Sequence, residues 1–487
     1  MQHRILTTVY VCTLLFCAQA AMATAAPVVT GGLTPHQVVQ CDIHGLATLS
    51  SNGTWDGDGG TVYGRVLAGE DVLVPWMEAG GANDGAWDGA VPGVPAGGPY
   101  TVAWKVGEAG EEAQVAHVLV GDLWVLAGQS NMFGRGNQDN LAQPDPRISA
   151  FGMDREWRVA ADPIHNLAQS PDPVHYTAKS EQQRQRAIRD YRDGTKGGGL
   201  GLPFAKEMLA RTGRPVGLIC TAHGGTSMDQ WDPAKKDRGA DSLYGSMLLS
   251  IEAAGGQVRG VLWYQGESDA GHAPDAYQDK MLRFIDAVRD DLGDSELPFL
   301  FVQLGRLVRE PNHEEHIAGW NTVRTAQLAI EKAHDRCDLA TAIDLELDDP
   351  IHIGTEGLKV LGKRLAHLAE KRAFGAQNGI GPRIAKVAKE STPFGERLRV
   401  TCTNVNGALT AAGRVNGFAI TAGPHGPEAP SIYDMEIDPD QPDEVLLWIQ
   451  KPPEDAHLWY GHNFNPYCNL EDEAGMALPA CGPFAVE

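Results

Sequence analysis

Positive charge is scarce in this chain. Its 487 residues include 63 Asp and Glu but only 40 Lys and Arg, which gives a formal net charge of −23. Such an acidic surface repels phosphate backbones and anionic lipid headgroups, because like charges meet at both. We therefore exclude nucleic acid and anionic membranes as partners.

Long hydrophobic runs are missing after the first 25 residues. The single long run covers residues 5–20, directly after Arg4, and small residues follow it. This order predicts a secretory signal peptide over residues 1–25. The run is short for a bilayer span, so a membrane anchor is the less favoured alternative. We expect a secreted or periplasmic protein that has no membrane contact after cleavage.

Cysteine is also sparse, with 8 residues in the whole chain. Disulfides persist in exported proteins, and the six cysteines beyond residue 25 leave several pairings open. We favour a bond between Cys468 and Cys481, because both lie in a loop-rich terminal segment. Cys220 lies in an apolar run and is expected to be a buried thiol.

The central part of the chain alternates short apolar runs with segments of helical periodicity, which predicts an α/β fold with a parallel sheet. The expected strands are residues 123–127, 216–222, 260–264, 299–304 and 339–343, and the expected helices are residues 273–292, 317–334 and a closing helix from 358. Both flanks instead show glycine-broken β-type runs, as in β-sandwiches. We predict an N-terminal β-rich module over 26–119, a catalytic domain over 120–376 and a C-terminal β-sandwich-like module over 377–487.

The most informative motif is Gly-Gln-Ser-Asn-Met at residues 128–132, because it places Ser130 at the carboxyl end of an expected strand. Downstream, Asp-Pro-Ile-His at 349–352 places two residues between Asp349 and His352, so that the carboxylate can fold back and orient the imidazole as a general base. A serine with such a base attacks ester carbonyls and forms an acyl-enzyme. We predict a triad of Ser130, His352 and Asp349, with Asp348 as the alternative orienting residue.

Two further segments suit the stabilisation of an oxyanion. Gly224 and Gly225 follow an apolar run, and glycine lets backbone N–H groups approach a substrate oxygen closely. In Trp-Tyr-Gln-Gly-Glu-Ser-Asp at 263–269, the amide of Gln265 is an uncharged donor. Glu267 either contributes to the site or ties down its own loop.

No metal or cofactor is predicted. The run from His313 to His316 has the wrong spacing for the His-Glu zinc motifs, and a solvated helix start is the preferred interpretation. The segment 134–199 shows little apolar periodicity and many charges. We expect a loop or lid over the site, with a plain solvated insertion as the alternative.

Taken in order, GQSNM, GGTS, WYQGESD and DPIH resemble the motifs of the sialate O-acetylesterases within the SGNH hydrolase superfamily. The similarity extends to residues 120–124 and 465–470. The resemblance implies a flavodoxin-like parallel sheet sandwiched by helices. It also implies that Ser130 is the nucleophile, His352 the base and Asp349 its orienting residue. Backbone N–H groups near Ser130 and Gly225 would complete the oxyanion hole.

One position departs from the superfamily name, because Gln265 stands where the name has asparagine, as in the sialate O-acetylesterase branch generally. We place Gln265 in the oxyanion hole. Substrate-binding or supporting roles are assigned to the residues around these motifs, namely Gln129, Asn131, Glu267 and Arg135. Arg135 or Arg306 would be needed to offset the negative charge of the protein if the sugar is anionic.

The predicted function is therefore a serine esterase that removes O-acetyl groups from carbohydrates, either sialic acid or an acetylated polysaccharide such as xylan. An inactive carbohydrate-binding protein is the alternative from another class. A general esterase or lipase is a third, although Ser130 lacks the Gly-x-Ser-x-Gly setting of those enzymes. The oligomeric state is left open.

Overall fold

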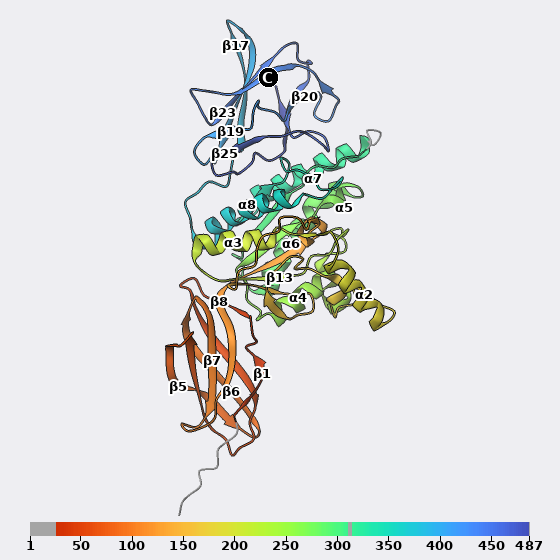
Figure 1. Cartoon of the computed structure of the whole chain (residues 1–487). Helices are drawn as coiled ribbons and strands as arrows, with labels where there is room; N and C mark the ends of the chain where they lie inside the picture. The colour runs from red at the N-terminus through yellow and green to blue at the C-terminus, as the bar shows by residue number, and fades with distance from the viewer. Residues whose placement is uncertain (1–25, 310–313, 487) are drawn as a thin grey trace, which may run out of the picture.

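The computed structural model describes residues 26–309 and 314–486. The predicted signal peptide and His313 lie outside these residues. Figure 1 shows three regions stacked along the long axis of the molecule: a β-rich region at the N-terminal end, a mixed α/β region in the middle and a second β-rich region that holds the C-terminus.

The N-terminal region is a mainly antiparallel sheet whose strands alternate buried and exposed residues, around a core that includes the fully buried Trp104. Its strands are β1 (Val28–Gly32), β2 (Val38–Gln40), β3 (Leu46–Thr54), β4 (Gly60–Ala68), β5 (Asp71–Asn83), β6 (Ala86–Pro95), β7 (Gly97–Val106) and β8 (Ala113–Gly128). The first half of β8 pairs with β7, and its second half enters the central sheet beside β13. The strand that leads to Ser130 is therefore anchored in both regions.

The central sheet has the order β11-β10-β13-β8-β14-β15-β16, and all of its neighbouring strands are parallel except the edge pair β10 and β11. The additional strands are β10 (Ile148–Phe151), β11 (Trp157–Val159), β13 (Val216–Cys220), β14 (Gly260–Tyr264), β15 (Phe299–Gln303) and β16 (Cys337–Thr341). Each expected central strand is present, because a strand covered on both faces needs a continuous apolar run.

Helices cover both faces of this sheet. Trp124 of β8 packs against Phe204 of α3, and Trp263 of the adjacent β14 packs against Phe284 of α6. In the register of the two strands Trp263 lies beside Ala127, so its side chain points to the face opposite that of Trp124. Because successive side chains alternate between faces, α3 and α6 lie on opposite sides. The helices are α1 (Ser130–Phe133), α2 (Glu181–Arg192), α3 (Gly201–Thr212), α4 (Leu243–Ala253), α5 (Glu267–Ala270), α6 (Tyr277–Leu292), α7 (Glu314–Ala333) and α8 (Thr355–Phe374).

The segment 134–199 is more ordered than predicted. It supplies β10 and β11 to the central sheet, the short strands β9 (Gly136–Asn137) and β12 (Lys196–Gly198), and the exposed helix α2. A loop or lid over the site, and the alternative of a plain solvated insertion, do not describe residues 148–159, which belong to strands of the central sheet and their connection. All four residues of β10 are buried, but a run of that length is too short to show a period.

The C-terminal region contains two four-stranded sheets, β17-β18-β23-β22 and β21-β20-β24-β26, around a separate hydrophobic core. The strands are β17 (Arg383–Thr392), β18 (Gly395–Thr403), β19 (Leu409–Ala411), β20 (Phe418–Ala422), β21 (Glu428–Ala429), β22 (Ile432–Ile437), β23 (Glu444–Ile449), β24 (Ala456–Tyr460), β25 (Leu470–Asp472) and β26 (Cys481–Ala485). The favoured disulfide was wrong, because Cys468 and Cys481 are both buried free thiols within this core. Cys220 is a buried free thiol, as predicted.

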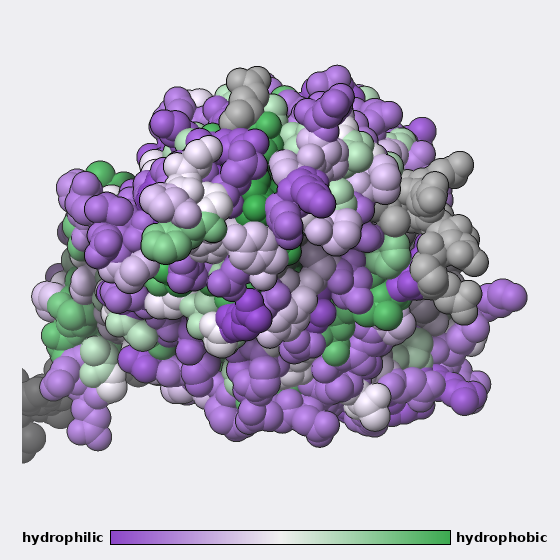
Figure 2. Space-filling view, turned by 90° about the horizontal axis from the view of Figure 1, so that it is seen from above, coloured by the Kyte–Doolittle hydropathy of each residue, from purple (hydrophilic) through white to green (hydrophobic). Residues whose placement is uncertain are grey.

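The surface is mainly polar. The face seen from above in Figure 2 is largely hydrophilic, with hydrophobic residues in small separate groups among the coloured atoms. Of the helices in the described ranges, none has the length and apolar character needed to cross a membrane.

Candidate active site

The sharp turn after β8 exposes Ser130 at the carboxyl edge of the sheet. Gly128 adopts a φ of 128°, and a Cβ at this position would lie only 2.2 Å from the carbonyl oxygen of Tyr264 on the neighbouring strand. Only glycine fits such a close approach of two backbones. The amide of Gln129 then donates to that same carbonyl at 2.8 Å, and α1 begins at Ser130.

Ser130, His352 and Asp349 form a hydrogen-bonded row, which we call the open row. Nε2 of His352 lies 3.0 Å from Oγ of Ser130, and Nδ1 lies 2.8 Å from Oδ2 of Asp349. The serine follows β8, whereas the other two residues lie on the loop between β16 and α8. Because the carboxylate accepts a hydrogen bond from the N–H at Nδ1, the proton of the neutral imidazole stays on Nδ1, and Nε2 has a free lone pair that faces the serine hydroxyl.

The Asp349 carboxyl is held in its ionised form. Burial raises its pKa, but hydrogen bonds from His352 and from the backbone N–H groups of Ile351 and His352 outweigh this effect, so the pKa lies below its ordinary value. Asp348, the alternative orienting residue, instead accepts a bond of 2.7 Å from the backbone of Asn137. The geometry thus selects Asp349 over Asp348 as the partner of His352.

Asn131 and Glu267 support the histidine loop. Oδ1 of Asn131 accepts a 3.0 Å bond from the N–H of Ile353, which follows His352, and Nδ2 donates to Oε1 of Glu267 at 2.7 Å. The carboxylate fixes the orientation of the Asn131 amide, because only the Nδ2 end can donate to it. Burial raises the pKa of Glu267 to about 7. Both residues lie next to the open row, with Asn131 almost fully buried behind it.

A loop at residues 223–226, the Gly-Gly loop, lies beside Ser130. Gly224 is so close that a Cβ built on it would lie 3.6 Å from Cβ of Ser130, and Gly225 has a φ of +70°. Within the described residues, the N–H groups of Ser130, Gly224 and Gly225 donate no hydrogen bond to the protein. These N–H groups are therefore available to bind an oxyanion.

Gln265 does not fit the role predicted for it in the oxyanion hole. Its side chain is fully buried, and Nε2 donates to the carbonyl of Thr226 at 2.9 Å and to the carboxylate of Asp269. It does not line the cavity at Ser130. The amide that was expected to bind substrate thus holds the end of the Gly-Gly loop, a role that depends on a contact across 39 positions of the chain.

A cavity of about 450 Å³ opens at the open row. Its lining includes Ser130, His352, Gly224, Gly225 and the predicted residues Gln129, Arg135 and Glu267. The other lining residues, to which the sequence analysis assigned no role, are Phe133, Leu167, Ser268 and Ile351. Arg135 and Leu167 come from the segment 134–199, so this insertion does border the site. Arg135 forms no ion pair or hydrogen bond with the described residues. Arg306 instead pairs with Glu346 at 2.9 Å and lies outside this lining.

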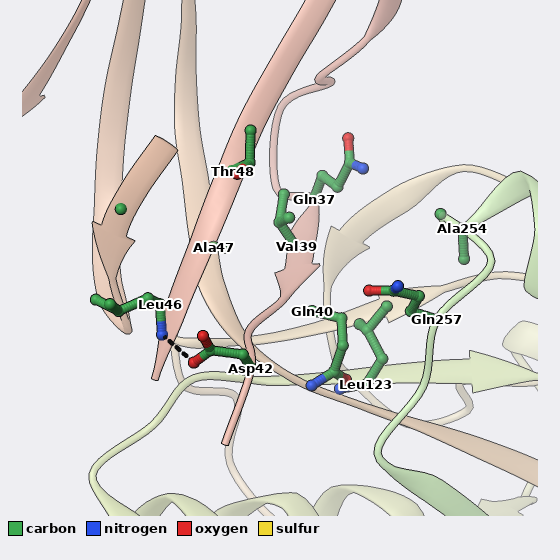
Figure 3. A pocket seen from close by; sticks show the side chains of 12 residues that line it. Gln37, Val39, Gln40, Asp42, Leu46, Ala47, Thr48, Leu123, Ala254 and Gln257 are labelled. Carbon is green, nitrogen blue, oxygen red and sulfur yellow. Dashed lines mark hydrogen bonds between the residues drawn. The ribbon is translucent and has the colours of Figure 1, made fainter. Parts of the chain in front are cut away.

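Another cavity, of about 550 Å³, lies between the N-terminal sheet and the central region (Figure 3). Gln37, Gln40, Asp42 and Gln257 are among its lining residues, and none of the open row borders it. Gln40 is already engaged there, because it accepts from the N–H of Leu123 at 2.7 Å. Across the described ranges, no group of three or more His, Cys, Asp and Glu side chains is arranged to hold a metal ion.

An α/β sheet that carries such a row and cavity at its carboxyl edge has the arrangement of a serine hydrolase. Comparison with known proteins gives the class, a carboxylic ester hydrolase, and the family. The family model described as "Carbohydrate esterase, sialic acid-specific acetylesterase" matches residues 120–371, just over half of the chain. The chain belongs to this family, as the motifs predicted.

Relatives in this family are distant. The chain is 29% identical over 267 residues to a probable carbohydrate esterase of Arabidopsis thaliana, which covers 50% of this chain and 88% of that protein. It is 24% identical over 310 residues to the sialate O-acetylesterase of Homo sapiens, and the match covers only 56% of each. The solved structure of a carbohydrate acetylesterase from Xanthomonas citri covers 94% of this chain and 99% of its own, with a TM-score of 0.64 at 24% identity. That likeness supports the fold.

Proposed function

We propose that this protein is a serine esterase that hydrolyses O-acetyl groups on carbohydrates. The observation that carries the proposal is the open row, in which Nε2 of His352 lies 3.0 Å from Ser130 Oγ while Asp349 holds Nδ1. The family and the open cavity at this row support the same function. The strand order β13-β8-β14-β15-β16 also supports a flavodoxin-like arrangement of the catalytic domain.

The proposed reaction has two halves. Ser130 Oγ bonds to the acetyl carbon while its proton passes to Nε2 of His352, and the resulting oxyanion accepts from the N–H groups of Ser130 and Gly225. The intermediate then breaks its bond to the sugar oxygen, which leaves with the proton from His352. Water attacks the acetyl-enzyme in the same way and releases acetate, which restores Ser130 and neutral His352.

Arg135 favours a sugar that carries a carboxylate. It is a cation at the cavity wall without an ion-pair partner among the described residues, and it opposes the negative charge of the protein as a whole. A bound carboxylate would pair with its guanidinium. We therefore place O-acetylated sialic acid ahead of neutral acetylated polysaccharides such as xylan.

Export is also proposed, from the pattern of residues 1–25. Signal cleavage near residue 25 would leave the protein secreted or periplasmic. N-terminal sequencing of the exported protein tests this point. A mature chain that begins at Met1 would contradict it.

The function is tested by acetate release from a panel of O-acetylated sialic acids, acetylated xylan and p-nitrophenyl acetate, with Ser130→Ala measured in parallel. We expect release that depends on Ser130 and is fastest on the sialic acids. Binding of the sugars without any acetate release would favour the carbohydrate-binding alternative and contradict the esterase.

A further inference from the structure

A second set of polar residues includes the first residue of the Gly-Gly loop, and the proposed reaction does not use it. Three of its four members are buried, and the fourth, His223, is half-buried. Oγ of Ser246, on α4, donates to Oδ2 of Asp172 at 2.5 Å and lies 3.0 Å from Nε2 of His175. Nδ1 of His175 lies 3.1 Å from Nδ1 of His223, the first residue of the Gly-Gly loop. We call Asp172, Ser246, His175 and His223 the buried row. Its members come from three separate parts of the chain.

The direction of each hydrogen bond in the buried row follows from Asp172. Its Oδ2 accepts from Arg155 at 2.7 Å as well as from the Ser246 hydroxyl. Since the hydroxyl proton is used there, Ser246 Oγ has only acceptor capacity left for His175. Nε2 of His175 must therefore carry a proton and donate it.

The proton position on His175 also determines which nitrogen of His223 donates. His175 is neutral, because burial lowers its pKa to about 3, so it carries a single N–H. With that proton on Nε2, its Nδ1 is a bare acceptor. The 3.1 Å contact is a hydrogen bond only if His223 donates from its own Nδ1. The ring planes of the two histidines lie within 25° of each other, at a centroid distance of 5.2 Å.

His223 is also held at its backbone, where the Gly-Gly loop begins. Its N–H donates to the carbonyl of Gly128 at 2.9 Å, and its carbonyl accepts from the Thr226 hydroxyl at 2.8 Å. Gln265 holds the carbonyl of Thr226 at the other end of the loop. Side-chain anchors therefore lie at both ends of the loop. Of the two glycines between them, Gly224 lies against Ser130, and Gly225 lines the same cavity.

We propose that His223 is a positioning residue that fixes the Gly-Gly loop for oxyanion binding, through an Nδ1–H held by the buried row. The proposal rests on the proposed function, because it assumes that Gly225 donates to the oxyanion. His223 acts through Nδ1 and not by touching the sugar, since its side chain does not line the cavity at Ser130. Because Asp172 and His175 belong to the insertion 134–199, the insertion and the loop are ordered together.

Two amide substitutions separate the nitrogen atoms of His223. In His223→Asn the amide nitrogen takes the place of Nδ1 and can still donate to His175, whereas in His223→Gln it takes the place of Nε2 and cannot. We expect His223→Gln to lower kcat by roughly 10-fold or more on both p-nitrophenyl acetate and an acetylated sugar, by displacement of the oxyanion donors. KM should stay within about 2-fold, because only transition-state contacts change. His223→Asn should keep most of the activity.

The proposal would be overturned if His223→Gln were active and His223→Asn were impaired on the sugar alone. In that case Nε2 of His223, and not Nδ1, would make the functional contact. Equal kcat for both variants and the parent protein would overturn it as well. His367→Gln is the matched control, since His367 is a buried histidine on α8 that bonds through Nε2 to the carbonyl of Gly379, away from the site, and the Gln amide nitrogen takes the place of Nε2. It should leave kcat unchanged.

Ser246→Ala removes the acceptor for Nε2 of His175 without a change in the loop, and it replaces His223→Gln if that variant does not fold. A kcat that falls a few-fold at constant KM supports the proposal, and an unchanged kcat contradicts it. Ser130→Ala separates this inference from the function itself. If the parent protein has no Ser130-dependent activity, the proposed function fails, whereas Ser130-dependent activity that is insensitive to His223 and Ser246 defeats only the inference.

Discussion

Two Asp-Pro-x-His segments in this protein have opposite consequences. Asp349-Pro350-Ile351-His352 belongs to the open row and Asp172-Pro173-Val174-His175 to the buried row. Each histidine lies 3.0 Å from a serine through Nε2. In the open row the carboxylate binds the far nitrogen of the imidazole, whereas in the buried row it binds the serine hydroxyl.

The position of the carboxylate decides which histidine is a base. Asp349 accepts a hydrogen bond from the Nδ1–H of His352, so Nε2 can accept the proton of Ser130. Asp172 accepts from the hydroxyl of Ser246 instead, so His175 can only donate to that serine. Ser246 and His175 are also buried, whereas Ser130 and His352 line a cavity. A serine next to a histidine is therefore not sufficient evidence for a nucleophile.

Replacement of the two serines should give the largest contrast. Ser130→Ala is expected to lower kcat on p-nitrophenyl acetate by at least about 10³-fold, because the nucleophile is lost. Ser246→Ala should lower it only a few-fold. Steady-state kinetics of both variants, with circular dichroism as the folding control, checks this. Similar losses in both variants would break the distinction between the rows.

The two aspartates sharpen the same contrast. Asp349→Asn should reduce kcat by about 10² to 10⁴-fold, because His352 loses the partner that sets its tautomer. Asp172→Asn should act mainly on stability, since it leaves the half-buried Arg155 without its carboxylate, at a cost of about 1–3 kcal/mol in the free energy of unfolding. Kinetics and urea unfolding of the pair measure both effects. An Asp349→Asn enzyme with full activity would contradict the assignment of the open row.

Glu267, which lies next to the open row, should make the free energy of unfolding of the protein depend on pH. Its pKa is raised from 4.5 to about 7 by burial, so the folded state favours the protonated form. The stabilisation of the folded state by Glu267 is therefore fully present below pH 4.5 and is lost as the pH rises through 7. Relative to Glu267→Gln, the parent protein should lose up to about 3 kcal/mol of unfolding free energy between pH 4.5 and 8. Parallel pH dependences in urea unfolding would show that Glu267 does not titrate in this way.

Arg135 should give the smallest of these effects, because its proposed role is limited to the carboxylate of the substrate. We expect Arg135→Gln to raise KM for an O-acetylated sialic acid by about 10-fold, at a loss of about 1.4 kcal/mol, and to leave KM for p-nitrophenyl acetate unchanged. Acetylated xylan is the neutral carbohydrate control. An equal rise in KM on all three substrates would mean that Arg135 shapes the cavity and does not bind a carboxylate.

The fold and part of the site could be predicted from local signals. β14 matches its expected range because a strand with both faces buried is apolar throughout. Ser130 follows from a motif directly after β8, and His352 from the spacing of the Asp-Pro-Ile-His motif. The N-terminal and C-terminal β-rich regions were recognisable from glycine-broken β-type runs. Their exact boundaries with the central domain stay predictions.

The remaining features depend on contacts between distant residues. The direction of the Gln265 amide is set by Thr226 and Asp269, and the pairing of Ser246 with Asp172 spans 74 positions of the chain. A motif does not report such neighbours. One signal for the buried row was readable, since Asp-Pro-Val-His at 172–175 repeats the pattern at 349–352. Its histidine has the opposite proton arrangement, which only the contacts of Asp172 reveal.

Covalent labelling tests the central claim most directly, because it identifies the reactive serine without knowledge of the sugar. The protein is treated with a fluorophosphonate that modifies activated serines, and the modified peptide is located by mass spectrometry. We predict one modification, on Ser130, which is absent from Ser130→Ala and present in Ser246→Ala. Modification of Ser246, or full esterase activity after Ser130→Ala, would contradict the account.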